Sequence, residues 1–142
     1  MTHIEFHLLN GVTPLDYACL LVTSLYRRNQ TIHLVGDEPL LHELNQKLWH
    51  FDESAFIAHE LYSSGKTAPV LLANGEQEPK HDHTLISISD ITPKYFSRFR
   101  FFYEIVADDE ANKQKSRERY KAYRDKGYPL EHKAVAGLNL PF

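Results

Sequence analysis

Cysteine, long apolar runs and a basic leader are scarce in this chain or missing from it. Its 142 residues include a single cysteine, Cys19, so no disulfide can form within the chain, which favours a reducing compartment. No apolar run approaches the roughly 20 residues that cross a bilayer, and no charged leader followed by an apolar stretch opens the sequence. We therefore expect a cytoplasmic protein without membrane contact.

Positive charge is not in excess either. The chain has 16 Lys and Arg against 19 Asp and Glu, for a formal net charge of -3. A protein that coats nucleic acid needs a general excess of cations to neutralise phosphates, so direct nucleic-acid binding is not expected. Any basic surface must be local. The length and the ordinary share of apolar residues indicate a single globular domain.

Recognisable signatures of enzymes are missing as well. Ser64-Gly65-Lys66-Thr67 resembles the end of a phosphate-binding loop, but Glu60 occupies the place of the first glycine of that motif. A strand-like run follows Thr67, where the motif needs the N-terminus of a helix. A small nucleotide-binding α/β enzyme that uses Lys66 and Thr67 is therefore only the alternative hypothesis.

The histidines of the chain do not form a metal-binding pattern. His81 and His83 are the densest pair, and they lack the third ligand and the helical spacing of catalytic zinc sites. No G-x-S-x-G elbow is present, and Cys19 has no cationic neighbour in the sequence that would activate its thiol. We expect no metal, no cofactor and no catalytic residue.

Hydrophobic periodicity predicts an α/β fold. Alternating or short apolar runs predict strands over 3–9, 31–35, 68–73, 84–89 and 101–106. Helical spacing with capping residues predicts helices over 15–28, 39–49, a short one from Pro93 to Arg98, and one from Asp108 or Asp109 to Gly127. The order of these elements gives a three-layer sandwich with a mostly parallel sheet. Residues 51–65 are expected to be mostly irregular. Residues 1–128 form the predicted domain, and residues 129–142 form a flexible tail.

The final helix carries the most informative pattern. Its cations and one aromatic residue share a face at spacings of three and four: Lys113, Arg117, Tyr120, Lys121 and Arg124. Guanidinium groups beside an aromatic wall suit an acidic peptide with a terminal carboxylate. The alternative is a solvated face with internal ion pairs, such as Glu118 with its basic neighbours.

Trp49 and Phe56 lie where the chain leaves a helix for an irregular stretch. Large aromatic side chains are often buried in the core, and they also dominate the energetics of protein interfaces. Both interpretations stay open at this point.

Several segments of the chain match one sequence signature. The most specific is Arg117 to Arg124 (RERYKAYR), followed by Gly127 and Tyr128. With the opening FHLL at 6–9 and Leu48-Trp49, it resembles the chi subunit family of bacterial DNA polymerase III, which is part of the clamp-loader complex. SAFIAHEL at 54–61 is also similar to the S-F-x-x-H-x-L stretch of that family.

The resemblance implies a Rossmann-like domain that binds no nucleotide and has no catalytic activity. It also implies pairing with the psi subunit and binding of the acidic C-terminal tail of single-stranded-DNA-binding protein, which ends in Pro-Phe after aspartates. Arg117 would contact the terminal carboxylate region, with Tyr120 and Lys121 in the same pocket. Lys113 and Arg124 would attract the aspartates. Trp49 and Phe56 match aromatic residues of the family that contact psi or an alternative helicase partner.

The end of the chain departs from the family pattern. The segment GLNLPF at 137–142 resembles the tip of the tail that the basic helix would bind, and also the hexapeptide that binds the sliding clamp, with Gly137 in place of the usual glutamine. Two hypotheses follow, a weak clamp ligand or a self-inhibitory mimic of the tail. Both rest on Leu138, Leu140, Pro141 and Phe142. The alternative is a disordered terminus.

Overall fold

The computed structural model describes residues 1–142 and contains seven strands, three α-helices and two short 3₁₀ turns. The elements in chain order are β1 (His3–Asn10), α1 (Pro14–Arg27), β2 (Ile32–Val35), α2 (Glu38–Leu48), β3 (His59–Leu61), a 3₁₀ turn (Tyr62–Ser64), β4 (Val70–Ala73), β5 (Thr84–Ser87), a 3₁₀ turn (Phe96–Arg98), β6 (Phe101–Val106), α3 (Glu110–Asp125) and β7 (Leu130–Ala136).

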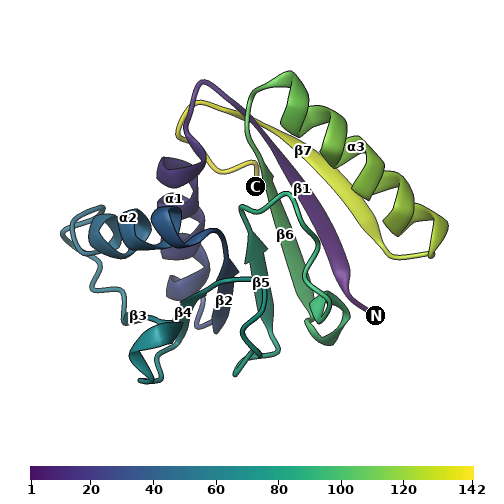
Figure 1. Cartoon of the computed structure of the whole chain (residues 1–142). Coiled ribbons are helices and arrows are strands. Elements are labelled where there is room, and N and C mark those ends of the chain that lie inside the picture. The colour runs from purple at the N-terminus through teal and green to yellow at the C-terminus, as the bar shows by residue number, and fades with distance from the viewer.

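All seven strands belong to one parallel sheet, in the order β3-β4-β2-β5-β6-β1-β7. Helices α1 and α2 pack on one face of this sheet, and α3 lies across β6, β1 and β7 on the other face (Figure 1). The predicted three-layer, Rossmann-like α/β sandwich is confirmed. None of the helices combines the length and the apolar character that a membrane-spanning helix needs.

The helix boundaries follow the capping residues in the sequence. Thr13 accepts a hydrogen bond from the Asp16 backbone N–H at the start of α1, and Asp37 does the same for Leu40 in α2. Asp109 caps α3, and Gly127 ends it in the left-handed region with φ of 81°, where a glycine meets no steric penalty.

Two elements differ from the sequence prediction. The stretch 51–65, expected to be mostly irregular, contains β3, which pairs with the edge of β4, and then a 3₁₀ turn. Three residues are too few to show a period of two, so the strand left no pattern in the sequence. The short helix expected after Pro93 is a single 3₁₀ turn over Phe96–Arg98.

The prediction of a flexible tail over 129–142 is wrong for its first half, because Leu130–Ala136 forms β7 beside β1. Only Val135 is buried in this strand, and most of its other side chains are exposed. An edge strand is held mainly by backbone pairing on one side, so its side chains need not alternate between apolar and polar. The domain therefore continues through Ala136.

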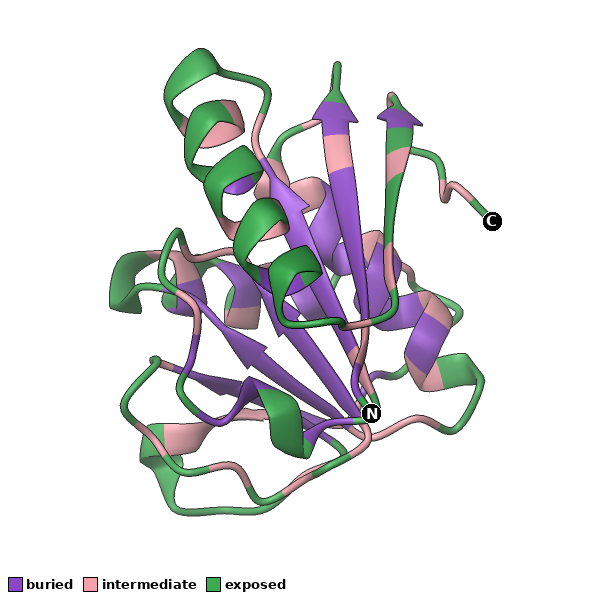
Figure 2. Ribbon diagram, turned by 90° about the vertical axis from the view of Figure 1, so that its right-hand side faces the viewer, coloured by how far each residue is buried: buried purple, intermediate pink, exposed green.

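The core has two parts, one on each side of the sheet. Figure 2 shows the mostly buried strands that lie between them. The part under α1 and α2 is larger and mostly aliphatic, whereas the part under α3 is smaller and rich in aromatic rings. Phe6, Phe96, Phe102 and Tyr123 pack together there, with ring centroids between 5.4 and 6.1 Å apart in each contacting pair. This aromatic layer fixes α3 above β1.

Candidate functional site: a basic pocket between α3 and the sheet edge

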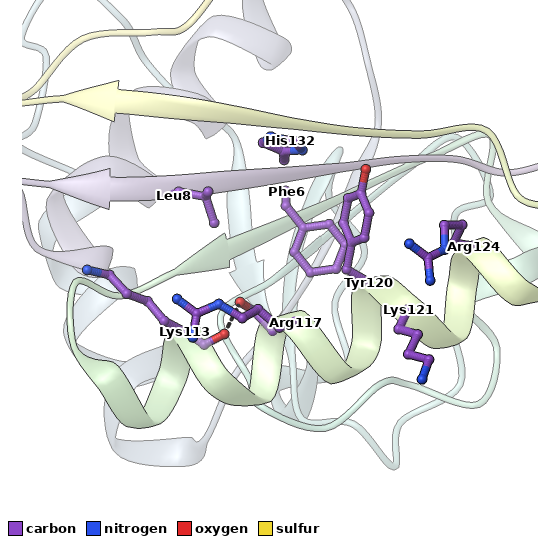
Figure 3. A pocket seen from close by; sticks show the side chains of 9 residues that line it. Phe6, Leu8, Lys113, Arg117, Tyr120, Lys121, Arg124 and His132 are labelled. Atoms are coloured by element: carbon purple, nitrogen blue, oxygen red, sulfur yellow. Dashed lines mark hydrogen bonds between the residues drawn. The ribbon is translucent and has the colours of Figure 1, made fainter.

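A pocket of about 610 Å³ lies between α3 and strands β1 and β7 (Figure 3). We call it the basic pocket. Nine residues line it: Phe6, Leu8, Lys113, Ser116, Arg117, Tyr120, Lys121, Arg124 and His132. All five residues that the sequence predicted for a peptide site are among them. Sequence reasoning missed the other four.

Apolar and aromatic groups form the base and one wall of the basic pocket. Phe6 and Leu8 point toward α3 because alternate residues of β1 face that side of the sheet. The Tyr120 ring lies 5.5 Å from the Phe6 ring, and the His132 ring of β7 lies 5.6 Å from Tyr120. The pocket can therefore hold an apolar or aromatic side chain.

The cations around the basic pocket are mostly free to bind a ligand. Arg117 donates a long bond of 3.4 Å to Gln114, and Lys121 forms no ion pair. Arg124 lies 3.9 Å from Asp125 in an exposed pair, which contributes little. Glu118 pairs with none of its neighbours, so the internal ion pairs considered for this helix do not form.

Lys113 is the exception, because its ammonium lies 2.8 Å from Asp108. That hydrogen bond raises the pKa of Lys113 above its ordinary value. Lys113 keeps its positive charge at neutral pH, but part of that charge is already compensated.

The opposite side of α3 anchors the helix to the domain. Lys115, Arg119 and Tyr123 lie at i, i+4 and i+8, and we call them the anchored face. Lys115 Nζ lies 2.7 Å from Asp90, and Tyr123 forms a 2.8 Å hydrogen bond with Thr92. These contacts join α3 to the loop between β5 and β6.

Arg119 makes the most buried contact of the anchored face. Its Nε donates to Glu104 Oε1 of β6 at 2.8 Å, and its Nη1 donates to the Asp90 carbonyl at 3.2 Å. The two side chains are 13% and 2% exposed. Burial raises the pKa of Glu104 despite the charge of Arg119, and its Oε2 has no hydrogen-bond partner.

Trp49 and Phe56 form a second candidate surface, the aromatic patch, at the far end of the sheet. Trp49 follows α2 and is 43% exposed, and Phe56 is 76% exposed, so the core-packing interpretation is wrong for both. Their rings lie 5.8 Å apart, and the His59 ring lies 4.2 Å from Trp49. His59 is itself fixed by the carbonyls of Ile57 and Asn45, so the patch rests on a rigid base.

The end of the chain packs on the sheet face opposite the basic pocket. Leu140 contacts the core under α1, and the Phe142 ring lies 5.2 Å from the Arg28 guanidinium and 5.1 Å from the Lys133 ammonium. The structure therefore contradicts the hypothesis that Phe142 fills the basic pocket of its own chain. Segment 137–142 instead closes over the α1 side of β7.

The phosphate-loop alternative fails on geometry. Lys66 and Thr67 lie before β4, at the amino end of the sheet, and a strand follows them. Ligands of open parallel sheets sit at the carboxyl ends of the strands. The cleft at the carboxyl ends of the strands is lined by three carboxylates, those of Asp37, Glu76 and Asp90, and by only one cation, Lys94, a balance that disfavours a phosphate.

One group has the residue types of a metal site. His3, Glu5 and Glu131 bring ligand atoms within 4.8 Å of one another. Glu5 is already paired, because its Oε1 lies 2.8 Å from His7 Nε2 and 3.2 Å from Lys133 Nζ. An ammonium group beside a ligand opposes the binding of a cation, so this group is better described as a balanced charge cluster.

Comparison with known proteins agrees with this architecture. The model of the family "DNA polymerase III chi subunit, HolC" matches residues 1–131. DNA polymerase III subunit chi of Pseudomonas aeruginosa is 33% identical over 135 residues, covering 92% of this chain and 95% of the relative. The subunits of the same name from Haemophilus influenzae and Escherichia coli are 26% and 27% identical, and each match covers 92% of this chain and 96% of the relative.

Among solved structures, T4 UvsW superposes with a TM-score of 0.71 at 7% identity, over 95% of this chain and 42% of that one. At this identity the likeness concerns the fold alone. The family match covers nearly the whole chain, and the resemblance noted in the sequence is confirmed. The chain belongs to the DNA polymerase III chi subunit family and is a non-catalytic accessory subunit of that polymerase.

Proposed function

We propose that this chi subunit binds the acidic C-terminal tail of single-stranded-DNA-binding protein in the basic pocket, and so links the polymerase to coated template strands. The observation that carries the proposal is that one pocket combines cations available to a ligand with an apolar base. Such a site reads a peptide, and the DNA is reached indirectly.

Different residues of the basic pocket are proposed to bind different parts of the peptide. The terminal aromatic side chain packs on Phe6, Leu8 and Tyr120, and the terminal carboxylate pairs with Arg117, whose planar guanidinium can bind it with two hydrogen bonds. Lys121 and Arg124 attract the aspartates that precede the aromatic residue. Lys113 contributes less, because Asp108 already holds its ammonium.

The aromatic patch is proposed to contact the psi subunit or a helicase that takes its place. Exposed Trp and Phe side chains on a rigid base are the residue types that dominate protein interfaces. The patch and the basic pocket lie at opposite ends of the sheet, so both partners can bind together (Figure 1). A cytoplasmic location goes with these partners.

Binding of the sliding clamp by Leu138, Leu140, Pro141 and Phe142 stays a prediction. Leu140 and Phe142 are packed against the domain, so a clamp would have to release them first. That release lowers the affinity that the same peptide would show when free.

Calorimetry with an acidic peptide that ends in Pro-Phe tests the main proposal. Arg117→Ala should weaken binding about tenfold, as expected when a charged hydrogen-bond partner is lost. The same peptide without its final phenylalanine should bind weakly to both proteins.

Lys115→Ala is the matched control, since it removes a cation from the anchored face of the same helix. Its peptide affinity should equal that of the unchanged protein. Equal affinities of Arg117→Ala and the unchanged protein would refute the assignment of the basic pocket. Trp49→Ala should leave peptide affinity unchanged and reduce the recovery of psi in co-purification.

A further inference from the structure

His132 lines the basic pocket, and the proposed peptide contacts give it no role. Its ring meets the Tyr120 ring edge-on, with 5.6 Å between the centroids and 72° between the planes. The residue is exposed, and neither ring nitrogen forms a hydrogen bond or an ion pair within the chain. Other histidines differ, because His7, His33 and His59 each use a ring nitrogen in an internal bond. The ring nitrogens of His132 are thus available to a ligand.

The cations of the basic pocket lie on its helix side only (Figure 3). All four of them belong to α3, whereas the sheet contributes Phe6, Leu8 and His132. This placement follows from the strand register, because β7 pairs His132 with Phe6 of β1 and so turns both side chains toward α3. His132 is therefore the one sheet-side side chain of the pocket that can donate a hydrogen bond to a carboxylate.

No acidic side chain lines the pocket around His132. The titratable and charged groups that face it from α3 are Lys113, Arg117, Tyr120, Lys121 and Arg124, and β1 faces it with apolar side chains. On β7 itself, Glu131 and Lys133 point to the other face of the sheet, where each is paired with a residue of β1. A carboxylate therefore reaches the His132 ring only as part of a ligand.

Histidine also changes its charge in a pH range where the other groups of this site do not. An imidazole loses its proton between about pH 5 and 8, whereas lysine, arginine and tyrosine side chains ordinarily keep theirs there. The carboxylates of an acidic peptide are ionised near neutral pH. Any change in peptide affinity between pH 6 and 8 therefore reports on a histidine.

We propose that His132 takes up a proton when the acidic peptide binds, and that its imidazolium then holds a carboxylate of the peptide from the sheet side. This inference rests on the proposed function and names the residue that makes it pH-dependent. A carboxylate beside an imidazole favours the charged form of the ring. Because linkage is reciprocal, a proton on His132 strengthens peptide binding by the same factor, so affinity rises as the pH falls.

A role in packing alone predicts a different outcome. The His132 ring contacts Tyr120, so its removal would then weaken peptide binding by one factor at every pH. The proton-coupled role predicts a loss of affinity at low pH that fades at high pH, where an imidazole is neutral. It also predicts that a permanent cation at this position replaces the proton.

Calorimetry of the full chain with an acidic peptide ending in Pro-Phe, at pH 6, 7 and 8 and one ionic strength, tests the proposal. The unchanged protein should bind about fivefold more tightly at pH 6 than at pH 8, as expected for one added charged contact. At pH 7 its binding enthalpy should depend on the ionisation enthalpy of the buffer, because a proton is taken up from it.

Two variants of His132 separate charge from packing. His132→Gln should bind with equal affinity at pH 6 and pH 8, and at pH 8 it should match the unchanged protein within about twofold. His132→Lys should also be independent of pH and should bind at pH 8 at least as tightly as the unchanged protein. Both should keep the melting temperature, since the side chain is exposed. His50→Gln is the matched control, because His50 is exposed beside the aromatic patch, and it should keep the full pH dependence.

Three results would overturn the role of His132 and leave peptide binding standing. They are equal affinities of the unchanged protein at pH 6 and pH 8, a pH dependence that survives in His132→Gln, and a His132→Gln loss of the same size at every pH. A His132→Lys variant that binds as weakly at pH 6 as His132→Gln does would also overturn it. Absence of peptide binding at every pH would overturn both this role and the proposed function.

Discussion

The two faces of α3 carry the same kinds of residue and do different work. Lys115 and Arg119 on the anchored face are paired with Asp90 and Glu104, whereas Arg117 and Lys121 on the pocket face have no acidic partner. Both faces would look equally basic on a helical wheel. The two faces differ because other elements of the domain place acidic side chains beside one face only. The role of a basic helix can therefore be assigned only when the contacts of each face are known.

Replacing Tyr123 on the anchored face should mainly lower folding stability, and replacing Tyr120 on the pocket face should mainly lower peptide affinity. Tyr123 is buried against Phe6, Phe96 and Phe102, so Tyr123→Ala should lower the free energy of unfolding by about 4 kcal/mol. Tyr120→Ala should cost much less stability and instead weaken peptide binding. Urea denaturation of both variants measures the two losses of stability, and equal losses would contradict this difference between the faces.

Arg119→Ala should destabilise the protein by about 3 kcal/mol, because it leaves the Glu104 carboxylate buried without a counter-charge. Lys115→Ala removes a half-exposed partner of Asp90 and should change the midpoint of thermal unfolding only slightly. The two melting temperatures give the comparison. A Lys115→Ala loss as large as that of Arg119→Ala would show that burial does not set the strength of the anchored face.

The loss of folding stability caused by Glu104→Gln should become smaller as the pH rises. Because burial raises the pKa of Glu104 in the folded chain above its ordinary value of 4.5, this carboxyl keeps its proton to a higher pH in the folded chain than in the unfolded one. The contribution of Glu104 to stability is therefore fully present below pH 4.5 and declines as the carboxyl ionises in the fold. Urea denaturation of both proteins between pH 4 and 7 tests this sign, and a cost that grows with pH would contradict it.

Lys121→Ala should have the smallest effect. Its melting temperature should be unchanged, since Lys121 is exposed and forms no ion pair, while acidic-peptide affinity should fall about twofold to threefold. Added salt should reduce the difference between the variant and the unchanged protein, because exposed charges are screened. A difference that persists in high salt would indicate that Lys121 is buried by the peptide.

Helical periodicity was sufficient to place the basic half of the pocket. Arg117, Tyr120 and Lys121 are fixed relative to one another by the helix alone, and capping residues mark where the helix starts and ends. The anchored face could not be predicted in the same way. Its partners Asp90 and Glu104 lie on other elements, and only the tertiary fold brings them to α3.

The apolar base of the pocket was only half visible in the sequence. The alternation in residues 3–9 put Phe6 and Leu8 on one side of a strand, but nothing in the sequence said which helix would cover that side. His132 left no signal, because β7 is an edge strand whose side chains are mostly polar. Its pairing with β1 depends on backbone hydrogen bonds that every sequence can make.

The order of the strands also makes the sheet a spacer of fixed length. The aromatic patch adjoins β3, and the basic pocket adjoins β1 and β7 at the other edge of the sheet. Because neighbouring strands are spaced about 4.8 Å apart, the two surfaces are separated by roughly 25–30 Å. A side chain bound in the basic pocket therefore cannot touch a side chain bound at the aromatic patch. Two linked ligands gain avidity only if their linker spans that distance, so the domain sets the minimum linker length of a partner that binds both surfaces.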